Sequence, residues 1–262
     1  GKPVSFEGNW HVASLRYIPG DIPFGNGHFC AGSLISLHKI VTAAHCFFDE
    51  ETDGPKHRFQ ITDNTIIISN NITYAYHSGY RPSRDYHDIG VIFLNKTIPA
   101  DHPVVKPITL NRFYQPTGTP CKTSGWGATN LESMPSLLHG IEINILDYKK
   151  CKQLFFYYWD EGMMCAGDWA GGKDACLGDS GGGLVCNDLL VGIVSWGVEC
   201  GRPRLPGIYT NVAYYLNWIQ NCKSADICNS GVVFQKQHVH SYAVMFLLIL
   251  TAFLMSNHRY CE

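Results

Sequence analysis

The chain has 262 residues, of which 45% are hydrophobic and 16% charged, and its formal net charge is −2. This composition is that of a globular protein with a sizeable core; it excludes a disordered chain and gives no sign of a nucleic-acid or polyanionic partner. Eleven cysteines indicate disulfides and an oxidising compartment, and a zinc site is not expected because the chain has no Cys-x-x-Cys pair and no His-Glu-x-x-His motif.

Short runs rich in β-branched and apolar residues recur along the chain, separated by Gly, Pro, Asn and Asp. They lie at residues 10–16, 28–35, 65–69, 89–94, 140–146 and 190–196. This spacing predicts an antiparallel all-β fold. A helical period is clear only at residues 212–219, where the apolar side chains would share one face.

Three polar residues stand out against this background. His45 precedes a cysteine, Asp88 stands at the mouth of an apolar strand, and Ser180 lies in the segment DACLGDSGGG at residues 174–183. A serine hydroxyl is a poor nucleophile unless a neighbouring base takes its proton, and histidine titrates near neutral pH. The three residues therefore predict a catalytic triad, in which Asp88 would orient the ring of His45 and stabilise its charged form.

The same segment supplies donors for a developing oxyanion. The backbone N–H groups of Gly178 and Ser180 are expected to form this oxyanion hole, and glycine suits a position where the chain must turn its amide inward. Taken singly, His45 could be structural, Asp88 could cap a turn and Asp174 could be a solvated loop charge. Their combination favours the catalytic interpretation.

Further motifs follow in a fixed order along the chain. They are Ala43-Ala44-His45-Cys46, the Asp88 segment, Thr123-Ser124-Gly125-Trp126-Gly127, Gly178-Asp179-Ser180-Gly181-Gly182, Ser195-Trp196-Gly197 and Pro206-Gly207-Ile208-Tyr209-Thr210. With them, residues 1–222 resemble a trypsin-like member of the chymotrypsin family of serine endopeptidases. Gly183 stands where the family usually has proline, a change outside the chemistry.

The resemblance implies two packed six-stranded antiparallel β-barrels with a C-terminal helix. One barrel would carry His45 and Asp88 and the other Ser180, so the active site would lie between them. The implied reaction is hydrolysis of peptide bonds through an acyl-enzyme, without a cofactor or a metal ion.

Substrate specificity also follows from the resemblance. Asp174 would lie at the floor of the primary specificity pocket, with walls formed by Ser195, Trp196, Gly197 and Gly207. A carboxylate at the floor of a roomy pocket implies cleavage after Arg or Lys. Ala175 lacks a hydroxyl that some relatives place beside the carboxylate, which favours arginine.

Asp179 is expected to take part in activation. In the family this aspartate pairs with a new N-terminal ammonium, released when a propeptide is cut, and the ion pair orders the specificity pocket and the oxyanion hole. The chain begins Gly1-Lys2-Pro3-Val4, which resembles the family's mature N-terminus without its first two or three residues. We therefore expect a zymogen whose first residues are missing here; a chain that never uses this switch is the alternative.

The resemblance implies four disulfides. The pairs are Cys30 with Cys46, Cys121 with Cys186, Cys151 with Cys165, and Cys176 with Cys200. Cys222, Cys228 and Cys261 remain; a local bridge between the first two and a free or intermolecular thiol are equally compatible with the sequence.

The composition changes after Cys222. We expect a protease domain at residues 1–222, a polar linker at 223–241, an apolar segment at 242–255 and a polar tail at 256–262. The uncharged run of 13 residues is short for a membrane-spanning helix. A short span, a lipid-anchor signal and a tail that packs on the surface remain open.

The sequence thus predicts a secreted or cell-surface endopeptidase, made as a zymogen, whose partners are protein substrates with Arg or Lys at the cleaved bond, protein inhibitors and an activating protease. The rival is a catalytically silent homologue that acts as a binding or regulatory protein. Asn71 and Asn95 lie in glycan acceptor patterns. Loops near residues 47–57 and 76–86 are expected to shape extended substrate preference.

Overall fold

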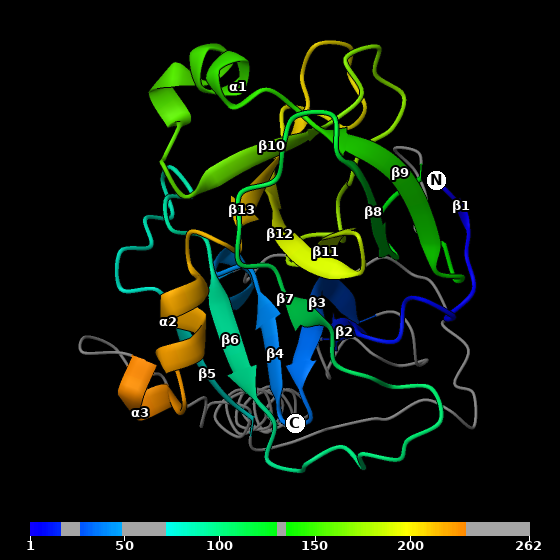
Figure 1. Ribbon diagram of the computed structural model, residues 1–262, viewed down its shortest axis with the longest axis vertical. Helices are drawn as coiled ribbons and strands as arrows, with labels where there is room; N and C mark the ends of the chain where they lie inside the picture. The colour runs from blue at the N-terminus through cyan, green and yellow to red at the C-terminus, as the bar shows by residue number, and fades with distance from the viewer. Residues whose placement is uncertain (17–26, 49–71, 130–134, 229–262) are drawn as a thin grey trace, which may run out of the picture.

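The computed structural model describes residues 1–16, 27–48, 72–129 and 135–228. Most of its regular structure is strand, arranged in two largely antiparallel sheets that lie one above the other in Figure 1. The all-β class predicted from the sequence is confirmed, and the paired sheets agree with the expected double-barrel architecture.

The sheet nearer the N-terminus has five strands within the described residues. Their order across the sheet is β2 (Val12–Arg16), β3 (His28–Ser36), β4 (Lys39–Thr42), β6 (Gly90–Phe93) and β5 (Thr73–Tyr76), all antiparallel to their neighbours. Every residue of β4 and β6 is buried, which explains why both strands are short runs dominated by Ile, Val and Phe. The predicted strand at residues 65–69 lies outside the described residues.

The second sheet closes on itself. Its ring runs β8 (Pro120–Gly125), β9 (His139–Ile145), β10 (Met163–Gly167), β13 (Gly207–Asn211), β12 (Leu189–Trp196) and β11 (Gly183–Cys186), and β11 pairs again with β8. Two short strands join it at the outside: β1 (Lys2–Pro3) pairs with β9, and β7 (Thr109–Leu110) runs parallel to β12. In β8 exposed and buried side chains alternate from Pro120 to Thr123, as the pleat of a strand with one face inside requires.

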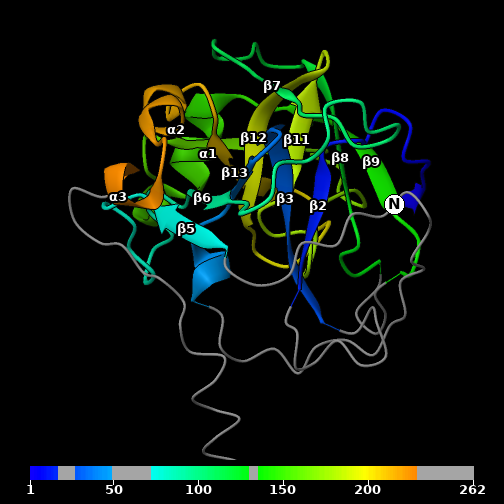
Figure 2. The same ribbon diagram turned by 90° about the horizontal axis from the view of Figure 1, so that it is seen from below.

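The described helices are short. They are η2 (His45–Phe47), α1 (Tyr148–Leu154), η3 (Phe156–Tyr158), α2 (Leu216–Asn221) and α3 (Ala225–Cys228), and α2 and α3 lie beside β5 and β6 in both ribbon views (Figures 1 and 2). A helix was predicted at residues 212–219, but α2 begins only at Leu216. The prediction of a helical turn at residues 212–215 was therefore wrong. The Asn211 side chain accepts a hydrogen bond from Ala213 N (3.0 Å) and closes a turn there instead.

One apolar cluster spans the two sheets and α2. It contains Val41 and Val91 from the first sheet, Ile193 from the second and Ile219 from the helix. Lys39 of β4 adds a polar contact with α2. Its ammonium group donates a hydrogen bond (2.9 Å) to the carbonyl of Ile219 in the last turn of that helix. These contacts hold the two sheets in one orientation.

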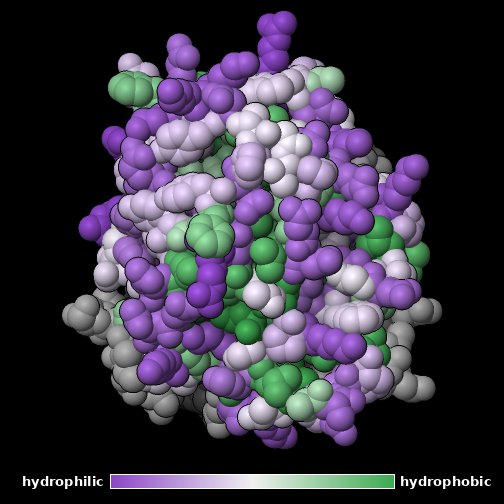
Figure 3. All heavy atoms as spheres, in the orientation of Figure 1, coloured by the Kyte–Doolittle hydropathy of each residue, from purple (hydrophilic) through white to green (hydrophobic). Residues whose placement is uncertain are grey.

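Polar residues cover most of the face seen in Figure 3, with apolar residues in smaller groups between them. In the part of the chain that the structure describes, no helix is long and apolar enough to cross a membrane. The apolar segment at 242–255 lies outside that part.

Candidate active site

His45 is held where the first sheet meets the second. It starts η2, three residues after the end of β4, and the two alanines before it are fully buried. A disulfide between Cys30 of β3 and Cys46 ties this turn to the sheet. The backbone of His45 is thus fixed on both sides, while its side chain keeps 16% exposure.

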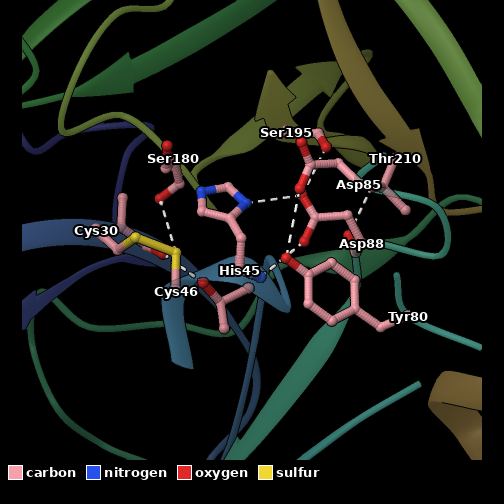
Figure 4. Close-up of polar contacts among 11 residues, drawn as sticks. Cys30, His45, Cys46, Tyr80, Asp85, Asp88, Ser180, Ser195 and Thr210 are labelled. Carbon is pink, nitrogen blue, oxygen red and sulfur yellow. Dashed lines mark hydrogen bonds and ion pairs between the residues drawn. A yellow bond between two sulfur atoms is a disulfide. The ribbon is translucent and has the colours of Figure 1, made fainter. Parts of the chain in front are cut away.

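Asp88 is buried, and both of its carboxylate oxygens accept hydrogen bonds from neighbouring residues. One carboxylate oxygen accepts from His45 N (2.9 Å); the other accepts from His45 Nδ1 (2.8 Å) and from the Ser195 hydroxyl (2.6 Å) (Figure 4). The residue is 1% exposed, so its negative charge depends on these donors. Its carbonyl also accepts from the Thr210 hydroxyl (2.6 Å), which anchors the backbone to β13.

Ser180 lies at the junction of the two sheets. Its carbonyl accepts from Ala31 N of β3 (2.7 Å), and the next residue, Gly181, donates to Val194 O of β12 (2.8 Å). Figure 4 shows the imidazole of His45 lying between Ser180 on one side and Asp88 on the other. The structure therefore brings together the three residues singled out in the sequence.

The loop before Ser180 takes a conformation that favours glycine. Gly178 has a φ of +95°, in the region where side chains are strained. Its carbonyl accepts from Nε2 of His28 (2.8 Å), and the ring's other nitrogen, Nδ1, lies 2.8 Å from the Ser14 hydroxyl. Burial lowers the pKa of His28 to about 4, so the ring is neutral and Nδ1 accepts from that hydroxyl.

His28 was not among the residues expected from the sequence. It opens a strand as one of twelve histidines, and its contact with Gly178 joins positions 150 residues apart. No local sequence pattern predicts a contact between residues so far apart in the chain.

Asp174 lies beside Gly207, one of the two glycines expected to line a pocket. One of its oxygens accepts from Gly201 N (3.1 Å); the other, Oδ1, is buried and has no hydrogen-bond partner among the described residues. Burial raises the pKa of Asp174 to about 6, and the backbone N–H groups of Gly201 and Ala175 oppose the rise. Burial of this oxygen without a donor carries a desolvation cost that no hydrogen bond within the described residues offsets.

Two of the residues expected in the walls around Asp174 are glycines, and their surroundings differ. A Cβ added to Gly207 would lie 2.6 Å from Asp174 Oδ1, whereas one added to Gly197 would come no closer than 3.9 Å to any atom and would face Gly207. The hydroxyl of Tyr209 is also buried without a partner within the described chain. The hydroxyl of Ser195, a residue expected in the wall, donates to Asp88 (2.6 Å).

Asp179 lines a small cavity of about 30 Å³, which Gly1 and Asp174 also line. Its two oxygens accept from Gly127 N (2.8 Å) and Cys176 N (2.9 Å). Burial raises its pKa, and these two N–H groups and the ammonium of the first residue lower it. Asp179 as a whole residue is partly exposed, although its carboxylate group is desolvated by burial.

Five disulfides are formed among the described residues. Four are the pairs implied by the resemblance, Cys30–Cys46, Cys121–Cys186, Cys151–Cys165 and Cys176–Cys200, and the fifth joins Cys222 to Cys228. Cys176 lies in the Asp174 segment and Cys200 next to Gly201, so their bridge joins two sides of the pocket. Cys261 lies outside the described residues.

Two groups of His, Cys, Asp or Glu within the described chain have ligand atoms close enough to share a metal ion. In Cys30, His45 and Cys46 the two sulfurs already form a disulfide. The other group is His45, Asp85 and Asp88, whose ligand atoms lie within 4.8 Å of one another. Asp85 was not expected to be at the site; it adds a second carboxylate near the imidazole.

Comparison with known proteins agrees with this geometry. The family model described as Trypsin matches residues 5–219. The chain is 36% identical over 220 residues to the protein named Trypsin from Sus scrofa, covering 82% of this chain and 95% of that protein. It is 36% identical to Trypsin-2 of Salmo salar (77% and 88% covered) and 37% identical to Trypsin eta of Drosophila melanogaster (72% and 75% covered).

Proposed function

Because the chain belongs to the trypsin family and is a serine endopeptidase, we propose that it cleaves peptide bonds after Arg or Lys through an acyl-enzyme on Ser180. In this mechanism His45 takes the proton of the Ser180 hydroxyl as it attacks the carbonyl carbon. The same imidazole then protonates the leaving amine. Water hydrolyses the acyl-enzyme by the reverse proton transfers.

The roles of the other groups follow from their contacts. Asp88 holds the Nδ1–H tautomer of His45, which turns Nε2 toward the serine, and stabilises the imidazolium during attack. The backbone N–H groups of Gly178 and Ser180 donate hydrogen bonds to the carbonyl oxygen and stabilise the negative charge that develops on it. His28 holds this loop in place through its hydrogen bond to the carbonyl of Gly178. No cofactor takes part in these steps.

The specificity proposal depends on one observation: Oδ1 of Asp174 is buried and has no hydrogen-bond partner in the part of the chain that the structure describes. A guanidinium or ammonium group would supply the missing donor and compensate the buried charge at the same time. An apolar substrate side chain would leave that oxygen unpaired, which favours basic residues at the cleaved bond. The planar guanidinium of arginine can bind both oxygens, so arginine is preferred to lysine.

We propose zymogen control through Asp179. An N-terminal ammonium that enters the cavity beside Asp179 would pair with its carboxylate, which lies between the Gly127 and Cys176 amides. Residues 176–180 carry both Asp179 and the oxyanion donors, so this ion pair would order the site for catalysis. An activating protease would create the ammonium.

The disulfides support a secreted protein that acts outside the cell, free or attached to the cell surface. Its partners would be protein substrates and protein inhibitors. The proposed layout remains a protease domain at residues 1–222 followed by a linker, an apolar segment that serves as a possible anchor, and a polar tail. Asn95 is exposed and could carry a glycan.

The test uses protein made from the full-length precursor and activated by limited proteolysis. Three peptides that differ only in Arg, Lys or Phe at the cleaved bond are compared, with Ser180→Ala as the control. The expected order of kcat/KM is Arg, Lys, then Phe. Turnover no greater than that of Ser180→Ala would favour a binding protein without catalysis, and preferred turnover of the Phe peptide would overturn the assignment of Asp174.

A further inference from the structure

His87 stands directly before Asp88 and has an uncommon backbone conformation. Its φ is +54°, in the left-handed region that residues with a side chain adopt only rarely. Its carbonyl accepts a hydrogen bond from Ile89 N (2.8 Å), which closes a three-residue turn centred on Asp88. The placement of His87 therefore helps to set the direction in which the Asp88 side chain leaves the backbone.

The imidazole ring of His87 is packed closely by its neighbours. It stacks on the ring of His77, with the centroids 4.7 Å apart and the planes inclined by 25°. The ring of Tyr215 stands edge-on to it at 5.9 Å. A Cβ added to Gly79 would lie 2.6 Å from Cδ2 of His87, so the ring also lies against the backbone there. These contacts leave the ring little freedom to turn.

A chain of hydrogen bonds starts at this ring. Burial, and after it the charge of Asp160, raises the pKa of Tyr215 well above its ordinary value, so the phenol keeps its proton. The Tyr215 hydroxyl donates to Asp160 Oδ2 (3.3 Å) and lies 2.8 Å from Nδ1 of His87. Because its one proton points to the carboxylate, the hydroxyl oxygen accepts from the Nδ1–H group of His87.

The titratable groups that contact the ring of His87 in the described chain are His77, Tyr215 and Asp160. Asp160 Oδ2 lies 3.5 Å from Nδ1 of His87. Burial, with a smaller contribution from His87, lowers the pKa of His77 to about 4, and Asp160 opposes this shift. Near neutral pH His77 is therefore uncharged, and its Nδ1 accepts from Gly79 N (3.1 Å).

This chain of contacts joins three parts of the molecule. His87 lies between β5 and β6 of the first sheet, Tyr215 directly precedes α2, and Asp160 lies between η3 and β10 of the second sheet. A Cβ added to Gly162 would overlap the Tyr215 hydroxyl, so that hydroxyl also packs against the backbone just before β10. The turn that carries Asp88 is thus fixed relative to the sheet to which the segment of Ser180 is bonded.

We infer that His87 is a positioning residue for the reaction: through Tyr215 and Asp160 it holds the turn that directs the Asp88 carboxylate to His45. This inference rests on the proposed function, since the direction of Asp88 affects turnover only if His45 and Ser180 carry out the acyl transfer. His87 itself contacts neither the imidazole nor the serine hydroxyl within the recorded hydrogen bonds, so it acts through the backbone of Asp88.

Two substitutions break the chain at different places. Tyr215→Phe removes only the hydroxyl, and His87→Gly removes the ring while glycine tolerates the φ of +54°. In the activated enzyme each is expected to lower kcat about fivefold and to change KM by less than about twofold. The loss is partial because Asp88 keeps the donors His45 N and Ser195 Oγ. The double variant is expected to lose no more than either single variant, since both break the same chain.

His87→Asn is the conservative substitution. The amide nitrogen of asparagine is attached to Cγ, as Nδ1 is in histidine, so it can donate to the Tyr215 hydroxyl, and asparagine tolerates a positive φ. This variant is expected to keep kcat within about twofold of the wild type, and adding Tyr215→Phe to it is expected to bring the fivefold loss back, to about one fifth.

Tyr148→Phe is the matched control. The Tyr148 hydroxyl also donates to a carboxylate, that of Glu161, the neighbour of Asp160. It has no recorded hydrogen bond to the turn of Asp88, so Tyr148→Phe is expected to keep the wild-type kcat. Thermal unfolding of every variant checks that the fold is intact, and if His87→Gly does not fold, Tyr215→Phe and His87→Asn carry the test.

The pH profile of kcat separates positioning from a purely structural effect. A weaker contact between Asp88 and His45 stabilises the imidazolium less, so the acid limb of the profile is expected to move about half a pH unit lower. The titration of His87 itself is lost only in His87→Gly. A shift that His87→Gly and Tyr215→Phe share therefore reports the contact between Asp88 and His45.

Three results would count against the inference. Wild-type kcat and an unmoved acid limb in Tyr215→Phe would overturn it and leave the proposed function standing, as would a kcat in His87→Asn as low as in His87→Gly. An equal loss in Tyr148→Phe would show a general effect on the loop and would also overturn it. If the wild type cleaves no peptide faster than Ser180→Ala does, the proposed function itself fails.

Discussion

The hydroxyl of Ser195 donates a 2.6 Å hydrogen bond to Asp88 Oδ2, the same oxygen that accepts from His45 Nδ1. Ser195 belongs to β12 of the second sheet, while Asp88 lies two residues before β6 of the first. The orientation of the buried carboxylate is therefore set from both halves of the molecule.

Ser195→Ala is expected to lower kcat by about tenfold with little change in KM, because one hydrogen bond to a buried charge is lost while the substrate pocket keeps its shape. Steady-state kinetics with an Arg peptide measure both constants. Ser33→Ala is the matched control, since the Ser33 hydroxyl is buried and has no partner within the described chain. An equal loss of kcat in both variants would contradict the prediction.

Asp174 predicts a pH dependence of cation binding. Burial raises its pKa to about 6, so the carboxylate is charged above that pH and becomes neutral as the pH falls through it. We expect the affinity for the amidinium of benzamidine to be constant above pH 7 and to fall about tenfold by about pH 5. Calorimetry on the His45→Ala variant measures this without the titration of His45, and an affinity that stays constant down to about pH 5 would refute it.

Gly207→Ala is expected to reduce kcat/KM for Arg and Lys peptides by about 100-fold. The new methyl group would lie 2.6 Å from Asp174 Oδ1, so either the carboxylate moves or the substrate cannot reach it. Gly197→Ala serves for comparison, because its Cβ meets no atom closer than 3.9 Å and a smaller loss is expected. Thermal unfolding of both variants checks that the fold is intact, and a larger loss in Gly197→Ala would reverse the assignment.

The disulfides should differ in their contribution to stability. Cys121–Cys186 joins residues 65 apart in the sequence and Cys222–Cys228 residues 6 apart. From loop-closure entropy, replacing the first pair by alanines should lower the free energy of unfolding by about 4 kcal/mol and the second by about 2 kcal/mol. Denaturant unfolding of the two double variants tests this order, which a greater loss from the shorter loop would contradict.

Much of the fold could be predicted from local sequence. Alternation and β-branched residues located β3, β6, β9 and β12 to within a residue or two at each end, because burial of one face imposes that pattern on the chain. The start of α2 could not be predicted, since apolar spacing from Val212 continues through a turn that the Asn211 side chain stabilises. Apolar spacing reports burial and cannot distinguish a turn from the helix that follows it.

The site was predictable only where the chemistry has a local signature. Ser180 and His45 lie in short motifs, whereas the contacts of His28 and Asp85 depend on how distant segments pack. The spacing of Cys222 and Cys228 also could not decide whether they pair, because two cysteines six residues apart can form a disulfide but need not do so. The pairing of β4 with β6, which brings the segment of Asp85 toward that of His45, is a property of the assembled fold.

The bonds of residues 180 and 181 to both sheets bear on how the protein is made. A growing polypeptide emerges with His45 and Asp88 long before Ser180, and β12 and β13 follow later still. Until those last strands close the ring, the serine has no fixed place beside the imidazole. A ribosome can therefore carry almost the whole protease domain before any of it is able to attack a neighbouring protein, and a fragment that contains either half alone would be inert.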